Sequence, residues 1–390
     1  MHKGFSATWV MICFFALLSP SLVEAKDLIV GVSTPLSGAA APTGLGLLRA
    51  VELPTEEINA AGGIKVGKDS YQVKLVVYDN KYDAKEAVAV ANKLIYSDKA
   101  KYIITLGATN VIATNPLTTE NKILHIASSY GGKKTTNPNA PYTFRSVMEP
   151  AQSHTILLPW IAQKYGLKTI AITSTDDETG LVQAEDAENV AKKIGLTITD
   201  KTFAPRGTAD FTPMLTKLIA KNPQAIDFGS WAGSEGPLVC KQVKELGYKG
   251  LLIFSYIQSI SVFQKVAGEY MDGALFYSVF ATDPTPLASR VTKRYEEKYR
   301  EKIDPIVLRN YDILLVLQKA IETSGTLDTT AVKNAMPKVN VDGVFGRTRI
   351  GGKSYYGIDA QFLAPVPLCM FDGQQKKFIE LHRGIMPADY

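Results

Sequence analysis

The sequence predicts an α/β protein of two lobes, in which two doubly wound parallel sheets with flanking helices are joined by three crossing strands. Three observations lead to this prediction. Short apolar runs alternate with helical patterns from Asp27 to about Ser129, and the same alternation begins again near Thr169. Two long helical patterns follow late in the chain with few strands beside them, as expected if the chain returns to complete the first lobe.

The first unit begins directly after the N-terminal segment. Each of its predicted strands is a short apolar run, which is typical of a strand buried on both faces. Its first helix ends at Gly62-Gly63, because glycine readily takes the left-handed conformation that terminates a helix. The strands are expected at Leu28–Val32, Val73–Tyr78, Tyr102–Leu106 and Leu124–Ala127, and the helices at Leu45–Ala60, Ala84–Tyr96 and Asn110–Asn121.

The second unit repeats this order of strands and helices. Two similar α/β units indicate two lobes with a cleft between them. The strands are expected at Thr169–Thr173, Ile198–Phe203, Ala225–Gly229 and Leu251–Phe254, and the helices at Thr179–Ile194, Phe211–Lys221, Glu235–Leu246 and Ser259–Ala267.

The late helices, Pro286–Lys302 and Pro305–Ser324, are expected to belong to the first lobe. The crossing strands are then expected at Tyr142–Val147, at Ala274–Ala281 and within Phe345–Ile358. The first lobe should comprise residues 26–147 plus 279–350, and the second lobe residues 148–278 plus 351–390.

The N-terminal segment has the features of a cleaved export signal. Lys3 supplies the positive start, Trp9–Leu18 forms the apolar core, and Val23-Glu24-Ala25 gives the small-x-small pattern of a cleavage site. An uncleaved anchor is the alternative, but this core is too short to span a bilayer. Met11-Ile12 before Cys13 differs from a lipoprotein signal, which needs small residues there. We therefore expect residues 1–25 to be removed and the rest of the chain to be soluble outside the cytoplasm.

Composition excludes some classes of partner. The formal net charge is +5 on 390 residues, and the basic residues are dispersed rather than clustered, so nucleic acid is not an expected partner. Cys240 and Cys369 are the cysteines that follow the signal. In an oxidising compartment they could form a disulfide or remain two buried thiols, and the sequence leaves both open.

Several segments together resemble one known family. LIVGVSTPLSG, INAAGGI, the run Val76–Ile95 (VVYDNKYDAKEAVAVANKLI) and KYIITLGATN occur in the order and spacing of the leucine/isoleucine/valine-binding family of periplasmic solute-binding proteins. The resemblance implies the type I periplasmic binding protein fold. It also implies a monomer without cofactor that closes around an amino acid or related organic acid in the periplasm and delivers it to the permease and ATPase of an ABC importer.

The resemblance places the carboxylate of the ligand at two turns of the first lobe. The first turn is Ala108, Thr109 and Asn110, which open a helix whose N–H groups suit an anion. An ordinary helix cap by Thr109 or Asn110 is the alternative. The second turn is Ser128, Ser129 and Tyr130, for which solvated loop serines are the alternative.

The remaining walls of the site follow from the same resemblance. Leu36, Ser37 and Thr43 should line the first lobe, with Thr43 where relatives often carry an aromatic cover. The matching positions in the second lobe are Thr179, Trp231, Ala232 and Tyr256.

Tyr256 departs from the amino-acid-binding pattern, because relatives that bind α-amino acids usually have a glutamate there to pair with the ammonium group. Asp176, Asp177 or Glu235 could supply a displaced carboxylate, with solvated loop charges as the alternative. A buried ammonium without such a partner costs several kcal/mol. An aromatic carboxylate is therefore a competitor to a branched-chain amino acid.

Catalysis is not expected. His125, His154 and His382 are isolated in the sequence; His125 lies in an apolar strand, and His154 could reach the cleft. No metal-binding spacing, nucleophile elbow or phosphate loop occurs, so no catalytic, metal or cofactor site is expected. The expected mechanism is hinge closure around the ligand. A periplasmic sensor subunit that feeds a membrane chemoreceptor or kinase is the alternative function.

Overall fold

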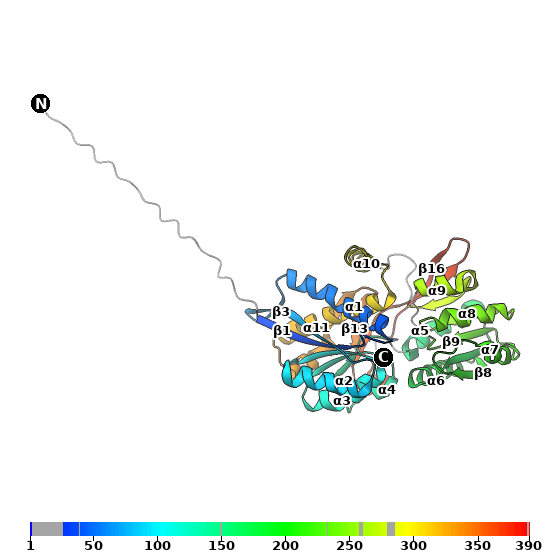
Figure 1. Cartoon of the computed structure of the whole chain (residues 1–390), viewed down its shortest axis with the longest axis horizontal. Coiled ribbons are helices and arrows are strands. Elements are labelled where there is room, and N and C mark those ends of the chain that lie inside the picture. The colour runs from blue at the N-terminus through cyan, green and yellow to red at the C-terminus, as the bar shows by residue number, and fades with distance from the viewer. Residues whose placement is uncertain are drawn as a thin grey trace.

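The computed structural model describes residues 1, 26–38, 40–148, 150–231, 233–256, 260–278, 285–387 and 390. The proposed signal at residues 1–25 therefore lies outside the described residues apart from Met1. Two sheets with helices on both faces form two lobes side by side (Figure 1). The fold class predicted from the sequence is confirmed.

The first sheet has the strand order β12-β13-β14-β6-β5-β4-β1-β3-β2 among the described residues. The run from β14 to β3 is parallel, and β2, β12 and β13 are antiparallel to their neighbours. The strands are β1 (Lys26–Thr34), β2 (Ile64–Val66), β3 (Asp69–Asp79), β4 (Tyr102–Leu106), β5 (Leu124–Ser128), β6 (Thr143–Arg145), β12 (Asn340–Gly343), β13 (Gly346–Gly351) and β14 (Gln361–Leu363).

Helices pack on both faces of this sheet. The helices of this lobe are α1 (Ala41–Ala60), α2 (Ala84–Asn92), α3 (Ala108–Glu120), α4 (Gly132–Thr135), α10 (Pro286–Tyr299), α11 (Pro305–Ser324), α12 (Thr329–Ala335) and α13 (Lys353–Tyr356). A π-helical turn, Lys93–Ser97, continues α2, and a 3-10 turn, Met336–Lys338, follows α12. The late helices α10 and α11 thus return to the first lobe.

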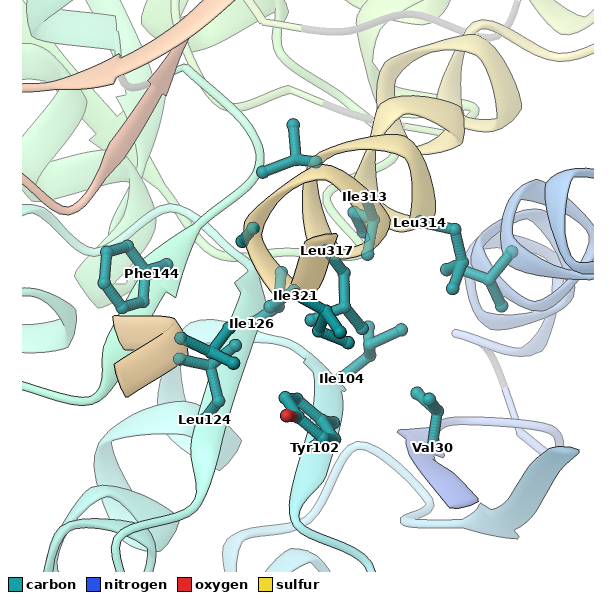
Figure 2. Close-up of a cluster of buried hydrophobic side chains, with 14 of the residues drawn as sticks. Val30, Tyr102, Ile104, Leu124, Ile126, Phe144, Ile313, Leu314, Leu317 and Ile321 are labelled. Carbon is teal, nitrogen blue, oxygen red and sulfur yellow. The ribbon is translucent and has the colours of Figure 1, made fainter. Parts of the chain in front are cut away.

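The core of the first lobe explains why α11 returns. Ile313, Leu314, Leu317 and Ile321 of this helix point toward the strand side chains, which include Val30, Tyr102, Ile104, Leu124 and Ile126 (Figure 2). Each of these side chains is at most 1% exposed. Burying such side chains stabilises the fold by roughly 1.5–3 kcal/mol each.

The second sheet has the order β16-β15-β11-β10-β9-β7-β8 among the described residues. Its strands from β11 to β8 are parallel, and β15 and β16 add an antiparallel edge. The strands are β7 (Thr169–Thr175), β8 (Thr197–Ala204), β9 (Ala225–Phe228), β10 (Leu251–Phe254), β11 (Leu275–Tyr277), β15 (Val366–Asp372) and β16 (Lys377–Gly384).

The second sheet is also covered on both faces. Helices α7, α8 and α9 contribute to one apolar cluster, and α5 and α6 contribute to another. The helices are α5 (Pro150–Tyr165), α6 (Glu178–Lys193), α7 (Thr212–Ile219), α8 (Glu235–Glu245) and α9 (Ile260–Ala267), with a 3-10 turn at Gly268–Met271. The two described cysteines, Cys240 and Cys369, are buried in this lobe and form no disulfide with each other. Of the two alternatives that the sequence left open, a disulfide or two buried thiols, the structure shows the buried thiols.

Three connections join the sheets, after β6, after β11 and between β14 and β15. The third connection is Ala364-Pro365, so its placement within Phe345–Ile358 was wrong. That stretch instead forms the end of the β12–β13 hairpin and α13, because the glycines at 346, 352 and 357 take positive φ angles and turn the chain. Strand β14 still belongs to the first sheet, beyond the residue 350 at which we expected the chain to leave that lobe.

Candidate functional site

The carboxyl ends of the parallel strands of both sheets face the region between the lobes. Side chains from these ends meet there: the rings of Tyr130 and Tyr256 lie 4.9 Å apart between centroids. Lys134 of α4 also forms a 2.8 Å ion pair with Glu178 of α6. Ligands of open α/β sheets bind outside such strand ends, so this is where a binding site is expected.

The first turn of the first lobe opens α3. Gly107 precedes the helix with a φ of +102°, which glycine adopts without strain, and it has no side chain with which to cap the helix. Ala108 and Asn110 are buried, whereas Thr109 is exposed. The Asn110 amide donates to the Leu106 carbonyl at 3.0 Å, so it does not cap the first N–H groups of α3. These groups remain suited to an anion.

The second turn follows β5. Ser128 and Ser129 are buried, and the Ser129 hydroxyl has no hydrogen-bond partner among the described residues. The Tyr130 hydroxyl accepts a 2.6 Å hydrogen bond from Arg309 of α11. Gly131, with a φ of +125°, is close to Ala108, where an added Cβ would lie 3.0 Å from its Cβ. The two predicted turns are therefore adjacent.

The β1–α1 loop contributes less to this region. The Leu36 N–H donates to Asp79 at 2.9 Å, while Ser37 and Thr43 are exposed. Tyr82, at the end of β3, lies over Gly107, where an added Cβ would be 2.9 Å from its ring. Tyr82 is thus an aromatic residue near this turn, whereas Thr43 supplies none. It was missed although it lies in the short loop between a predicted strand and a predicted helix.

The predicted positions of the second lobe are spread over different environments. Tyr256 follows β10 and contacts Tyr130, and Thr179 is half-buried in the first turn of α6. Trp231 is fully buried in the apolar cluster of α7 and α8, with its ring edge-to-face against Phe211. Ala232 lies outside the described residues.

Arg206, in the loop after β8, pairs with two of the three candidate acids predicted from the sequence, whereas Asp176 is exposed. Arg206 binds Asp177, and it lies 3.6 Å from Glu235. Asp177 also caps α6 through the Gly180 N–H at 2.9 Å and accepts from the Thr175 hydroxyl. Burial acts to raise the pKa of Asp177, but these hydrogen bonds and Arg206 outweigh it and lower the pKa. Asp177 is therefore an ionised and fully engaged group.

Arg309 differs from Arg206, because no carboxylate of the described chain lies within ion-pair distance of it. Its guanidinium is half-buried, donates to Tyr130 and lies 5.8 Å from the centre of that ring. Burial, with Tyr130 and Tyr82 nearby, raises the pKa of Tyr256, although Arg206 and Arg309 act in the opposite direction. Tyr256 is thus a neutral hydrogen-bond donor. We call Tyr82, Tyr130, Arg309, Arg206 and Tyr256 the interlobe site.

The histidines lie away from the interlobe site. His154 is buried in the second lobe with its Nε2 atom 2.7 Å from Asp227. His125 is in the first-lobe core, where burial lowers its pKa to about 3. His382 stacks on Trp160. Within the described residues, no group of three metal-binding side chains is arranged to hold an ion.

A family model described as periplasmic binding protein matches residues 28–367. The chain belongs to the periplasmic binding protein family. Its resemblance to the leucine/isoleucine/valine-binding group is confirmed by a relative, Leu/Ile/Val-binding protein homolog 3 of Brucella melitensis. That protein is 24% identical over 345 residues, which cover 88% of this chain and 91% of the relative. At the level of the family, this supports a binding protein rather than an enzyme.

Solved structures share the fold of this periplasmic binding protein. One is LivJ, a branched-chain amino acid transporter substrate-binding protein from Streptococcus pneumoniae in complex with isoleucine, with a TM-score of 0.74, 19% identity and coverage of 93% of this chain and 99% of that one. Another is a solute-binding protein of an ABC transporter from R. palustris in complex with benzoate, with a TM-score of 0.75, 18% identity and coverage of 93% and 98%. In the described part of this chain, every helix is too short or too polar to cross a bilayer.

Proposed function

We propose that this periplasmic binding protein captures a small carboxylate between its lobes, with an aromatic acid preferred over an α-amino acid, and delivers it to an ABC importer. One observation carries the preference. Arg309 has no carboxylate partner among the described residues, whereas two of the three candidate acids for an ammonium group, Asp177 and Glu235, are held by Arg206, and the third, Asp176, is exposed. The site thus offers a cation, Arg309, while Asp177 and Glu235 are already engaged by Arg206.

The first lobe supplies the contacts for the carboxylate. The N-terminus of α3 presents N–H groups without a side-chain cap, and the Ser129 hydroxyl is buried without a hydrogen-bond partner among the described residues. Arg309 and Tyr130 lie beside this turn. Charge-assisted hydrogen bonds from such groups contribute roughly 1.5–3 kcal/mol each.

The remaining surface favours an aromatic body. Tyr82, Tyr130 and Tyr256 surround the region, and stacked or edge-on ring pairs contribute about 0.5–1.5 kcal/mol beyond the area they bury. An ammonium group would be desolvated beside Arg206 and Arg309, where Asp177 and Glu235 are already engaged by Arg206, and an unpaired buried ammonium costs several kcal/mol. The benzoate complex of the R. palustris neighbour fits this chemistry.

Closure follows from the position of the two halves of the site. A ligand held on the first lobe gains contacts with Tyr256 and Arg206 only when the lobes approach, so binding shifts the population toward the closed form. The closed form would be the species that the permease recognises. Cleavage of residues 1–25 would release the protein into the periplasm.

Calorimetric titration tests the proposed ligand class. We expect benzoate or a hydroxybenzoate to bind and leucine to bind weakly or not at all, because the amine contact is missing. Isoleucine and phenylalanine serve as matched probes, since phenylalanine shares the ring but carries an ammonium group. Tight binding of leucine with no binding of any benzoate would show that the preference is wrong.

A further inference from the structure

The last described residues of the chain connect the two lobes a fourth time. Strand β16 ends at Gly384 in the second sheet, where Gly384 pairs with Val366. Beyond it, the chain runs back toward the first lobe, and the end marked C lies between the lobes in Figure 1. We call Ile385, Met386, Pro387 and Tyr390 the hinge strap.

The first lobe holds the main chain of the hinge strap. Arg349 of β13 donates from Nη2 to the carbonyls of Met386 and Pro387, at 3.4 and 2.5 Å. The Gly352 N–H donates to the Tyr390 carbonyl at 2.8 Å. The Tyr390 ring also stacks on Tyr355 of α13, with 6.4 Å between centroids and 17° between planes.

The second lobe holds the side chains of the same segment. Met386 is 4% exposed and belongs to the apolar cluster of Leu157, Leu158 and Ile161 on α5. Tyr390 packs against that cluster as well. Because both lobes hold this segment, we expect a rotation of the lobes to loosen either the packing of Met386 or the bonds from Arg349 and Gly352.

Two direct hydrogen bonds between the lobes lie beside the hinge strap. Tyr355 donates to the buried carboxylate of Asp186 on α6 at 2.9 Å, and Gln152 of α5 donates to the Tyr356 hydroxyl at 2.9 Å. Both tyrosines belong to α13, the helix on which Tyr390 stacks. The hinge strap and α13 therefore lie next to each other, and both contact the second lobe.

We propose that the hinge strap, held by Arg349, Gly352 and Tyr355 of the first lobe and by the α5 core of the second, stabilises the lobe arrangement of this structure and sets its population in the absence of ligand. We call this arrangement closed because Tyr130 and Tyr256 meet across the interlobe site in it. Each contact that exists only in the closed arrangement adds to its population relative to the open one. This proposal concerns the hinge and holds whichever ligand the interlobe site binds.

Single-molecule fluorescence energy transfer on the ligand-free protein tests the hinge strap. Dyes are placed at Leu45→Cys on α1 and Leu181→Cys on α6, both exposed and away from the strap, while the native Cys240 and Cys369 are buried. In the double variant Arg349→Gln/Tyr390→Ala, we expect the closed fraction to fall about threefold or more. Arg347→Gln, which removes only a bond to Asn340 in the same hairpin, is the control.

Equal closed fractions in the double variant and the control would overturn the proposal. Thermal unfolding first checks that both variants fold cooperatively. If the double variant does not fold, Arg349→Gln alone, which keeps the ring stack, gives the same test, and Arg349→Lys should restore part of the closed fraction. The measurement needs no ligand, so its outcome is independent of the proposed preference for aromatic acids.

Discussion

The two walls of the interlobe site differ in how they carry charge. The first-lobe wall combines main-chain N–H groups of α3 with Ser129 and an arginine, Arg309, that has no carboxylate partner in the described chain. The second-lobe wall carries Arg206, which is bound to Asp177 and near Glu235. We therefore expect the first wall to receive an anion. The charge of Arg206 on the second wall is already paired with carboxylates, so we expect this wall to contribute mainly the ring and hydroxyl of Tyr256.

The largest expected effect comes from removing the cation of the first wall. Arg309→Gln should lower affinity for benzoate about 10–100-fold, because a charge-assisted contact is lost while Tyr130 stays in place. Calorimetry measures the change. The matched control is Arg300→Gln, an exposed arginine at the end of α10 that lies outside the interlobe site. Equal affinities for both variants would show that the two walls do not differ as described.

Giving the second wall an acid should change the preference of the site. Tyr256→Glu places a carboxylate where amino-acid-binding relatives usually have one, so the ratio of leucine to benzoate affinity should rise about tenfold or more. Competition titrations with both ligands measure this ratio. Tyr256→Gln, which matches glutamate in size without its charge, is the control. A similar ratio in both variants would contradict the role given to charge.

A smaller effect is expected from the buried hydroxyl of the first wall. Ser129→Ala should weaken carboxylate binding about threefold to tenfold, because the hydroxyl is free to donate to the ligand. Stability should remain unchanged, since the serine has no hydrogen-bond partner within the described chain. Titration and chemical unfolding of the same samples separate the two properties. Loss of stability with unchanged affinity would assign Ser129 to the fold instead.

The smallest effect on affinity is expected at Asp312, which lies behind the first wall on α11. Burial raises its pKa to about 6, despite hydrogen bonds from Val344 and Thr348. Because the folded pKa exceeds the unfolded value, this carboxyl destabilises the fold as pH rises from about 4 to 6, by up to about 1.4 kcal/mol per pH unit.

Asp312→Asn should remove this slope and leave ligand affinity unchanged. Urea unfolding between pH 4 and 8 measures the free energy of unfolding of both proteins. If the two curves stay parallel across this range, the carboxyl does not titrate as described.

The sequence predicted the strands and the α3 turn because these depend on local patterns. Buried parallel strands appear as apolar runs, and a turn directly follows such a run. The assignment of Ala108 and Ser129 to the ligand site came instead from the resemblance to the solute-binding family, and it stays a prediction. The contact between Arg309 and Tyr130 could not be predicted from local patterns, because the two residues are 179 positions apart in the chain. The pairing of Arg206 with Asp177 was missed for a similar reason, because it depends on how the β8–α7 loop folds over the start of α6.

The third connection shows another limit of sequence patterns. Phe345–Ile358 has the apolar and glycine content of a crossing strand, but it forms hairpin and helix at the sheet edge. Alternation of residue types predicts a strand without saying which neighbour it pairs with. The pairing of β14 with β6 and β13, which keeps the chain in the first sheet until Leu363, is set by tertiary contacts.

The buried cysteines have a practical consequence for measuring ligand binding. Burial raises the pKa of the Cys240 thiol to about 12, and Cys369 is also enclosed in the second lobe. Thiol-reactive dyes attack thiolates, so neither native cysteine should compete with one introduced on the surface. The wild-type background can therefore carry a single environment-sensitive fluorophore at the rim of the lobes, which makes the protein a ready scaffold for an optical sensor of its ligand.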